Sequence, residues 1–385
     1  MKGHVRKHGT GWQYTIELGT DPLTGHRKQK SKGGFKTERE AEKAMVSLIN
    51  EVNNGDYNVS IAINESMLLK DYLEKWLNAV KNNVRDKTYD TYCDLVKWYL
   101  LPKLGSIALK DLKAYEIQEH YTYMQDNEKG LGLSGTTACH VHNILNSSLK
   151  QAVDWELLYK NPCDKVQRPK RSEKEITVLD VEEVSRLFKA LEGGSLYIPT
   201  VVAVTTGMRR SEILGLKWQD IDMDNKIIYV KNQLVRGPNS FKLEKLKTDS
   251  SKRNILLLDF TIKVLQNEYE KQEINKSELR ELYNDESYLC CMGDGRPYDP
   301  EYISRHFLRK MTTLTTRLDI PKVTFHELRH THATLLLLSN VNPKVVSERL
   351  GHSKVFMTLD KYSHVLPNMQ KDAVEKLTET LHLDF

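Results

Sequence analysis

The sequence predicts an α+β multidomain protein with a small β-sheet-plus-helix N-terminal domain, a four-helix second domain, and a mainly α third domain with a small antiparallel sheet. Three patterns support this prediction. Short alternating strands open the chain, apolar residues then recur at helical spacing, and helices alternate with a few strands from Ile176 onward. A chain of 385 residues has room for two or three domains. We place them at residues 1–58, 64–168 and 174–385.

Composition narrows the class of protein. The formal net charge is +5 and the sequence pI is about 8.7, a mild basic excess. The five cysteines follow no disulfide or zinc-ribbon spacing, which fits a reducing cytoplasm. We find no signal peptide and no apolar run long enough to cross a bilayer, so we expect a soluble intracellular protein without a membrane partner.

The first 36 residues carry most of the basic excess. They hold eight Lys and Arg against two acidic residues, a local charge of +6. The expected elements are a strand over Trp12–Leu18, a turn at Asp21–Gly25, a returning strand over His26–Ser31, and a helix over Ala41–Val52 that follows a capping-box spacing at Thr37–Glu40. A basic sheet with one helix suits a module that reads a DNA groove, and a solvated basic hairpin is the equally weighted alternative. We predict that residues 53–64 form a linker.

Residues 66–168 are helical by period, with apolar stripes that predict core-facing helices. The stripes cover 68–80, 88–100, 111–123 and 134–156, and we expect the second helix to stop at Pro102. Their polar faces carry enough lysine and arginine to hold a DNA duplex by its phosphates. A basic, Pro-containing connector follows at 163–175.

The third domain begins with two predicted helices, Asp180–Leu191 and Tyr197–Thr206, the second ending at Gly207. Another helix opens after Met208. The expected strands are Lys226–Val230, Asn232–Val235 and Arg253–Leu257, with a lysine-dense hairpin at Lys242–Asp249, and helices resume at Phe260.

The stretch from Thr324 to His364 concentrates the residues that suggest chemistry. His326 and Arg329 are three apart, so they share one face of a helix. An imidazole and a guanidinium aimed the same way suit a phosphate oxygen. Tyr362, close by in sequence, can supply a nucleophile.

Five motifs in order resemble the tyrosine recombinase (phage integrase) family. They are Thr206-Gly207-Met208-Arg209-x-x-Glu212-Ile213-Leu214, a Lys-Thr in a hairpin, His326-x-x-Arg329-His-Thr-His-Ala, Leu350-Gly351-His352-Ser353, and Tyr362. The chain is most similar to integrases of temperate phages and conjugative transposons of Gram-positive bacteria. The resemblance implies that the three domains are an arm-type DNA-binding domain, a core-binding domain and a catalytic domain.

The resemblance also implies residue roles, and the chemistry of phosphodiester cleavage agrees with them. A phenol has a pKa near ~10, so Tyr362 must lose its proton as it attacks. Arg209 and Arg329 would hold the non-bridging oxygens, and losing one such donor typically costs about two to three orders of magnitude in rate. His326 would accept the phenolic proton or orient the phosphate. The implied roles of the others are a donor to a non-bridging oxygen (His352), the acid for the departing 5′ oxygen (Lys247), and an orienting carboxylate (Glu212). The product is a 3′-phosphotyrosine and a free 5′-hydroxyl, with no cofactor and no metal.

Some assignments leave alternatives. Lys247 is chosen because it precedes Thr248, and Lys242, Lys245 and Lys252 remain alternatives. Arg210 is interpreted as a solvated neighbour of Arg209. His330 and His332 are interpreted as structural.

Three other functions compete with recombination. His326-Glu327-Leu328-Arg329-His330 also fits the His-Glu-x-x-His zinc protease pattern, but this reading places Arg329 beside a dication and explains none of the other motifs. A type IB topoisomerase would use the same residues to relax DNA. A non-catalytic DNA-binding regulator would not need the nucleophile and both arginines.

The resemblance finally implies partners. They are double-stranded DNA, at core-type and arm-type attachment sites, and a homo-tetramer on two DNA sites. An excisionase and a host DNA-bending protein are candidate accessory proteins. The protein would act in the bacterial cytoplasm, on the nucleoid when active. The tail near Leu381–Phe385 could pack on a neighbouring protomer or on its own domain.

Overall fold

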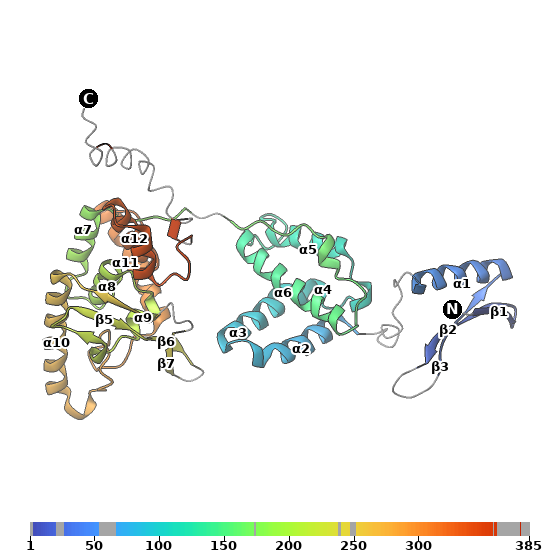
Figure 1. Ribbon diagram of the computed structural model, residues 1–385, viewed down its shortest axis with the longest axis horizontal. Coiled ribbons are helices and arrows are strands. Elements are labelled where there is room, and N and C mark those ends of the chain that lie inside the picture. Colours follow the sequence, from blue (N-terminus) through green and yellow to red (C-terminus); the bar gives the residue numbers. More distant parts are fainter. Residues whose placement is uncertain are drawn as a thin grey trace. The chain divides into compact units, whose positions relative to one another are not determined.

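The computed structural model describes residues 3–20, 27–53, 67–172, 175–237, 240–246, 252–356, 358–359 and 378. The chain forms two compact units, Met1–Lys174 and Glu175–Phe385. Figure 1 shows the elements of each unit. Among the described residues, no helix combines the length and the apolar character that crossing a membrane requires.

A small antiparallel sheet and one helix open the chain, as predicted, and the sheet has three strands. The strands β1 (Gly3–His8), β2 (Gly11–Thr20) and β3 (Arg27–Phe35) lie in that order, and α1 (Glu38–Asn53) packs on β2. Tyr14, Ile16 and Leu48 form the small core between them. The sequence did not predict β1. The expected turn at Asp21–Gly25 lies outside the described residues.

The predicted capping box begins α1. The Glu40 backbone N–H donates to Thr37 Oγ1 at 3.3 Å, and the Thr37 N–H donates back to Glu40 Oε2 at 3.4 Å. These two bonds satisfy donors that a helix start leaves without partners.

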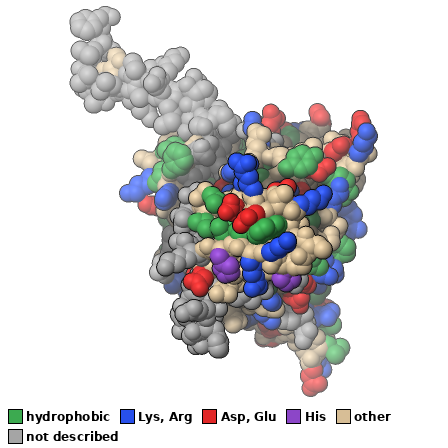
Figure 2. All heavy atoms as spheres, turned by 90° about the vertical axis from the view of Figure 1, so that its right-hand side faces the viewer, with side chains coloured by type: hydrophobic (Ala, Val, Ile, Leu, Met, Phe, Trp, Pro, Cys, Tyr) green, Lys and Arg blue, Asp and Glu red, His purple; other side chains and the backbone are tan. Residues whose placement is uncertain are grey.

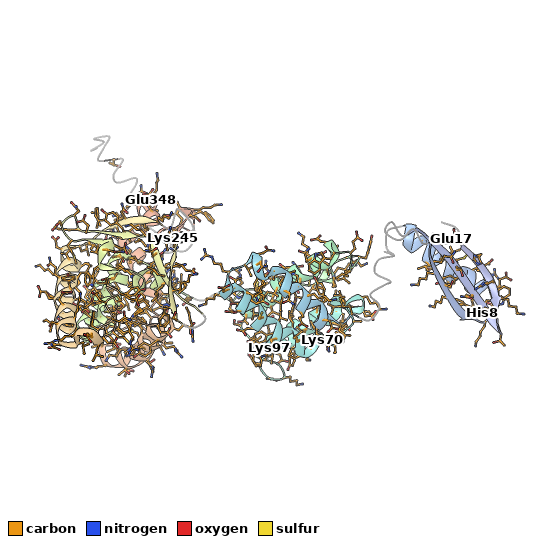
Figure 3. The ribbon with its side chains drawn as sticks, turned by 90° about the horizontal axis from the view of Figure 1, so that it is seen from below. His8, Glu17, Lys70, Lys97, Lys245 and Glu348 are labelled. Atoms are coloured by element: carbon orange, nitrogen blue, oxygen red, sulfur yellow. The ribbon has the colours of Figure 1, made fainter. Side chains whose placement is uncertain are left out.

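A helical segment follows, built from α2 (Leu69–Val80), α3 (Asp86–Leu95), α4 (Leu101–Leu104), α5 (Ala114–Gln125) and α6 (Gly135–Asp154). Residues of the predicted apolar stripes form its core, including Tyr72, Leu73 and Trp76 of α2. Lys70 and Lys97, labelled in Figure 3, are exposed. On the face shown in Figure 2, Lys and Arg side chains lie among acidic and apolar ones.

The expected helix stop at Pro102 is wrong. A π-helical turn, Val96–Leu100, follows α3, and α4 then takes Pro102 into its first turn. Proline lacks the backbone N–H, and the first turn of a helix does not need that donor. The wider π-turn shifts the hydrogen-bond pattern before the proline, so the chain stays helical until Leu104.

The basic connector begins on the helical segment rather than in solvent. The Gln167 N–H donates to Gln118 Oε1 of α5 at 2.9 Å, and Arg168 Nη2 donates to Asn143 Oδ1 of α6 at 3.1 Å. Gly135 lets the backbone come close, because a Cβ built there would lie 2.1 Å from Lys170 O. The connector is therefore packed on α5 and α6 as far as residue 172.

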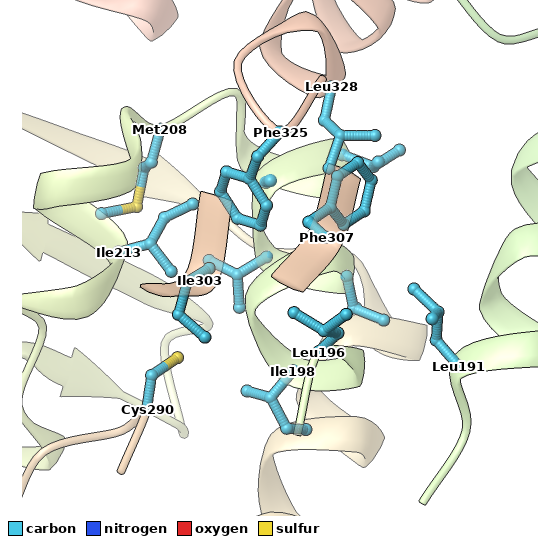
Figure 4. Close-up of a cluster of buried hydrophobic side chains, with 14 of the residues drawn as sticks. Leu191, Leu196, Ile198, Met208, Ile213, Cys290, Ile303, Phe307, Phe325 and Leu328 are labelled. Atoms are coloured by element: carbon cyan, nitrogen blue, oxygen red, sulfur yellow. The ribbon is translucent and has the colours of Figure 1, made fainter. Parts of the chain in front are cut away.

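The second unit is mainly helical with a small antiparallel sheet, as predicted. Its helices are α7 (Val181–Leu191), α8 (Tyr197–Thr206), α9 (Arg210–Leu214), α10 (Asp259–Leu279), α11 (Pro300–Leu318), α12 (Glu327–Leu338) and α13 (Pro343–Leu350). Every residue of α8 after Tyr197 is buried, so this helix is the centre of the core. In the same core, the ring of Phe307 of α11 packs edge to face against the ring of Phe325, with the ring centroids 5.4 Å apart (Figure 4).

The strands of this unit form two sheets. β4 (Ile221–Asp222), β5 (Ile227–Val230) and β8 (Arg253–Leu256) make one in the order β4-β5-β8, and β6 (Asn232–Arg236) pairs with β7 (Phe241–Lys245) in the other. The sequence predicted a lysine-dense hairpin at Lys242–Asp249, and its residues Lys242–Lys245 lie on strand β7, which pairs with β6 so that Leu234 is opposite Leu243. The strand itself was not predicted, because Phe241 and Leu243 are its only apolar residues among two lysines and a glutamate.

We predict that Gly135→Ala loosens the connector from α6. The added methyl group overlaps Lys170 O, and overpacking of this kind costs about 1–3 kcal/mol, which raises the open population of the connector roughly 5- to 160-fold. Limited trypsin digestion should cut faster after Lys170 and Arg171. Gly293→Ala is the control, because a Cβ there meets no heavy atom within 4 Å. Equal cleavage rates in wild type and Gly135→Ala would contradict the packing described here.

Candidate active site

Arg209 lies at the junction between α8 and α9. Gly207 ends α8 with a left-handed φ of +67°, and Arg209 is the extended residue that caps α9. Its Nη1 donates to Glu212 Oε1 at 2.7 Å, its backbone N–H donates to Glu212 Oε2 at 2.9 Å, and its Nη2 donates to Gly351 O at 3.2 Å. The Arg209 side chain is 36% exposed and that of Glu212 only 1%. The buried Glu212 therefore holds Arg209 on its inner side, and part of the Arg209 side chain faces solvent.

Arg329, in the first turn of α12, is buried to 4% exposure. Its Nη1 donates to Gly207 O at 2.7 Å and its Nη2 to Leu350 O at 2.6 Å. Arg329 and Arg209 thus donate to adjacent carbonyls of one turn, Leu350 and Gly351. The structure brings together two arginines that are 120 positions apart in the sequence.

His352 follows this turn directly. Gly351, with φ +67°, ends α13 in the left-handed conformation that glycine adopts without strain. His352 Nδ1 lies 2.8 Å from Thr358 Oγ1, which orients the ring. The turn therefore places His352 next to the carbonyls that hold both arginines.

His326 is exposed at the start of α12, three residues before Arg329. Its ring meets that of His330 at right angles, with centroids 5.1 Å apart. His330 is itself buried. His326 and Arg329 share the first turn of the helix, as the spacing predicts.

Glu327, the first residue of α12, closes the turn that precedes the helix. Its Oε2 accepts from the Thr324 backbone N–H at 2.6 Å, and its own N–H donates to Thr324 Oγ1 at 3.4 Å. A carboxylate used in this way is poorly placed as the general base of a zinc protease. Within the described ranges no group of three His, Cys, Asp or Glu side chains is arranged to hold a metal ion.

Two predicted site residues, Tyr362 and Lys247, lie outside the described residues, as does the tail at Leu381–Phe385. Of the alternative lysines, Lys242 and Lys245 lie on β7, and Lys245 is labelled in Figure 3. Lys252 is exposed just before β8.

Arg210 is not the solvated neighbour that the sequence suggested. Its Nη1 donates to Ser304 Oγ of α11, and burial lowers the pKa of its guanidinium, opposed by the charges of Glu301 and Asp299. Arg210 therefore ties α9 to α11, which leaves Arg209 as the arginine of the site.

Sequence reasoning missed two arginines, Arg253 of β8 and Arg349 of α13. Arg253 Nη2 donates to Glu212 Oε2 at 2.9 Å, and its Nε donates to Arg349 O at 2.6 Å. Arg349 Nε donates to His332 Nε2 at 3.1 Å, and its Nη2 donates to Thr205 O at 3.0 Å. Nothing in the local sequence separates these two from other surface arginines, so only the fold could show them.

The charges in this cluster shift two pKa values. Burial alone would raise the pKa of Glu212, but Arg253 and then Arg209 outweigh it and hold that pKa below its usual range. Burial, aided by the charge of Arg349, lowers the pKa of His332 to about 3. His332 Nδ1 lies 2.7 Å from Val204 O, where a neutral ring donates its proton and accepts from Arg349 on the other side. His332 is therefore structural, as the sequence suggested.

Comparison with protein-family models gives three matches. A model described as the phage integrase family matches residues 177–369, half of the chain. A model of an arm DNA-binding domain matches residues 4–52. A model of the phage integrase N-terminal SAM-like domain matches residues 68–125.

Full-length relatives are similar along almost the whole chain. The tyrosine recombinase XerC-like protein of Caldanaerobacter subterraneus subsp. tengcongensis is 29% identical over 98% of both chains. The ICEBs1 integrase of Bacillus subtilis is 26% identical over 98% of this chain and all of its own.

Solved structures share the fold. The Tn1549 transposon integrase in complex with a circular intermediate DNA covers 81% of this chain and 100% of its own, with a TM-score of 0.68 and 22% identity. A lambda integrase dimer bound to a COC′ core site covers 91% of this chain and 92% of its own, with a TM-score of 0.58 and 19% identity.

We predict that acid destabilises the second unit through His332. The pKa of His332 is lower in the folded state (about 3) than in the unfolded chain (6.5), so the unfolded chain binds the extra proton and stability falls as the pH drops through this window. Between pH 7 and pH 4.5 this costs about 2–3 kcal/mol. Melting temperatures of wild type and His332→Asn should converge as the pH falls, because Asn cannot ionise. Parallel curves would contradict a buried neutral histidine.

Proposed function

The chain belongs to the phage integrase family and is a tyrosine recombinase, and we propose that it cleaves and rejoins DNA through a phosphotyrosine on Tyr362 to integrate and excise a mobile element. The observation that carries the proposal is the pair Arg209 and Arg329, donating to the adjacent carbonyls Gly351 O and Leu350 O. Such fixed guanidiniums suit two non-bridging oxygens of one phosphate, because planar donors that are always charged need no reorganisation during the reaction.

The reaction proceeds as an exchange of esters. The Tyr362 oxygen attacks the phosphorus, and its proton passes to His326. Arg209, Arg329 and His352 stabilise the negative charge that develops on the non-bridging oxygens. The bond to the 5′ oxygen breaks, and Lys247 gives that oxygen a proton. A 5′-hydroxyl from the partner strand then attacks the phosphotyrosine and returns the tyrosine, so the bond energy is kept and no cofactor is consumed.

The proposed domain roles follow the family matches. The β1–β3 sheet with α1, at residues 1–58, would bind arm-type sites, because its strands carry the excess of positive charge. The helices at 64–168 would bind the core site together with the catalytic domain at 174–385. Strand exchange between two sites needs four active subunits, so the working form would be a tetramer on DNA. A lambda integrase tetramer bound to a Holliday junction is among the structures of similar fold.

Accessory proteins and location complete the proposal. An excisionase and a host DNA-bending protein would set the direction of recombination, acting through the arm-binding domain. The element would be a phage or conjugative transposon, since relatives include the ICEBs1 integrase and transposases of Tn916 and Tn1545. The protein would work in the bacterial cytoplasm, on the nucleoid.

We predict that wild type, but not Tyr362→Phe, forms a covalent complex with a nicked duplex that carries the junction sequence of its element. The nick lets the short strand diffuse away after cleavage, so the phosphotyrosine cannot be reversed. A denaturing gel run after incubation with EDTA should show a protein–DNA band for wild type alone. A band that persists in Tyr362→Phe would show that another residue is the nucleophile, and DNA binding without any band would favour a non-catalytic regulator.

We predict that Lys247→Ala slows cleavage by about 10² to 10⁴-fold, the range that general acid catalysis contributes. Replacing the bridging 5′ oxygen by sulfur should restore the rate, because a thiol leaves as a thiolate with a pKa near ~8.5 and needs no proton. Lys242→Ala and Lys245→Ala are matched controls on β7 that should stay near wild type on both substrates. Rescue by sulfur in one of these controls, and not in Lys247→Ala, would reassign the acid.

A further inference from the structure

Three successive carbonyls at the end of α13 each accept a hydrogen bond from a different arginine. Arg253 Nε donates to Arg349 O at 2.6 Å, Arg329 Nη2 donates to Leu350 O at 2.6 Å, and Arg209 Nη2 donates to Gly351 O at 3.2 Å. The three donors come from β8, α12 and the start of α9. A helix end leaves its last carbonyls without helical partners, so this turn can take all three.

Of the three, Arg209 is the most exposed, and the side chain of Arg253 is buried, as Arg329 is. The side chain of Arg253 is 7% exposed, against 36% for Arg209. It contacts Glu212 Oε2 at 2.9 Å, and Glu212 is the carboxylate that holds Arg209. It also packs on the turn itself, because a Cβ built on Gly351 would lie 3.1 Å from Arg253 Nη1.

We propose that Arg253 is a positioning residue that sets the phosphate-binding geometry of Arg209 and Arg329; the inference rests on the proposed function. Arg253 acts on Arg209 through Glu212. It acts on Arg329 through the α13 turn, because its bond to Arg349 O fixes the peptide next to Leu350 O. Arg253 itself does not touch the phosphate.

The fork shape of the guanidinium is what the position requires. Arg253 donates from Nε to a carbonyl and from Nη2 to a carboxylate, which lie in two fixed directions. A lysine has one ammonium at the end of a flexible stem, so it can keep the charge beside Glu212 without holding both partners. Arg253→Lys therefore separates the role of charge from the role of geometry.

The test uses the full-length protein and the nicked duplex described above, with Arg253→Lys and Arg253→Gln. Single-turnover cleavage is followed at saturating DNA, and three quantities are recorded: the rate constant of covalent complex formation, its final amplitude, and the dissociation constant for the duplex. Arg186→Gln is the control, because Arg186 Nη1 also donates to a carbonyl at a helix end, Leu318 O, at 2.8 Å, and Arg186 is an exposed residue outside the site.

We expect Arg253→Lys to lower the rate constant about 10²-fold, since misplacing a catalytic group by about 1 Å costs this much. Amplitude and dissociation constant should stay within about twofold of wild type, and Arg186→Gln should match wild type in all three quantities. A residue needed only for stability would reduce the amplitude, through the inactive fraction, and leave the rate constant unchanged. That outcome, or a wild-type rate constant in Arg253→Lys, overturns the inference.

A double variant tests the route through Glu212. If Arg253 acts on Arg209 by way of Glu212, Glu212→Gln combined with Arg253→Gln should be slower than wild type by clearly less than the product of the two single effects. Independent losses that multiply would overturn this route. If wild type itself forms no covalent complex, the proposed function fails and the inference with it; if wild type reacts and the Arg253 variants react equally fast, the inference alone fails.

Discussion

The contact between arginine side chains and main-chain oxygens at the end of α13 is the constraint on which the site depends. Four guanidiniums, those of Arg209, Arg253, Arg329 and Arg349, are tied into one hydrogen-bonded cluster, and Glu212 is the carboxylate bound within it. Like charges so close would repel each other strongly in a poorly solvated place. The negative end of the helix dipole and the carbonyl oxygens offset part of that repulsion. The surplus of positive charge that remains favours an anion, and a bound phosphate would relieve it.

The neutral state of His332 also limits the positive charge of this arginine cluster. A charged imidazole beside Arg349 would add a further cation to the cluster, and burial together with that charge holds its pKa near 3. As a neutral ring, His332 accepts from one arginine and links it to Val204 O at the end of α8. Gly207 makes room for this ring, since a Cβ there would lie 2.5 Å from His332 Cδ2. The buried His332 thus packs against α8 and also holds one arginine of the cluster.

Sequence patterns predicted features that depend on neighbouring residues, and missed contacts between residues far apart in the sequence. The end of α8 at Gly207, the cap of α1, and the shared helix turn of His326 and Arg329 follow from local sequence signals. Arg253 and Arg349 could not be found in this way, because their partners lie 17 to 144 positions away. The helix end expected at Pro102 was wrong because the π-turn before it shifts the hydrogen-bond pattern and the chain stays helical. Strand β7 was not predicted because its lysines face solvent on a two-stranded sheet.

Holding arginines by peptide oxygens rather than by side chains has an evolutionary consequence. Every residue type carries the same carbonyl, so the side chains at the end of α13 can drift without disturbing the bonds to Arg209, Arg253 and Arg329. Insertions or deletions there cannot be tolerated in the same way, because they would change which oxygen meets which arginine. Selection on this turn should therefore act on its length and on the left-handed Gly351, in addition to the contacts that the side chains of Arg349 and the buried Leu350 make themselves.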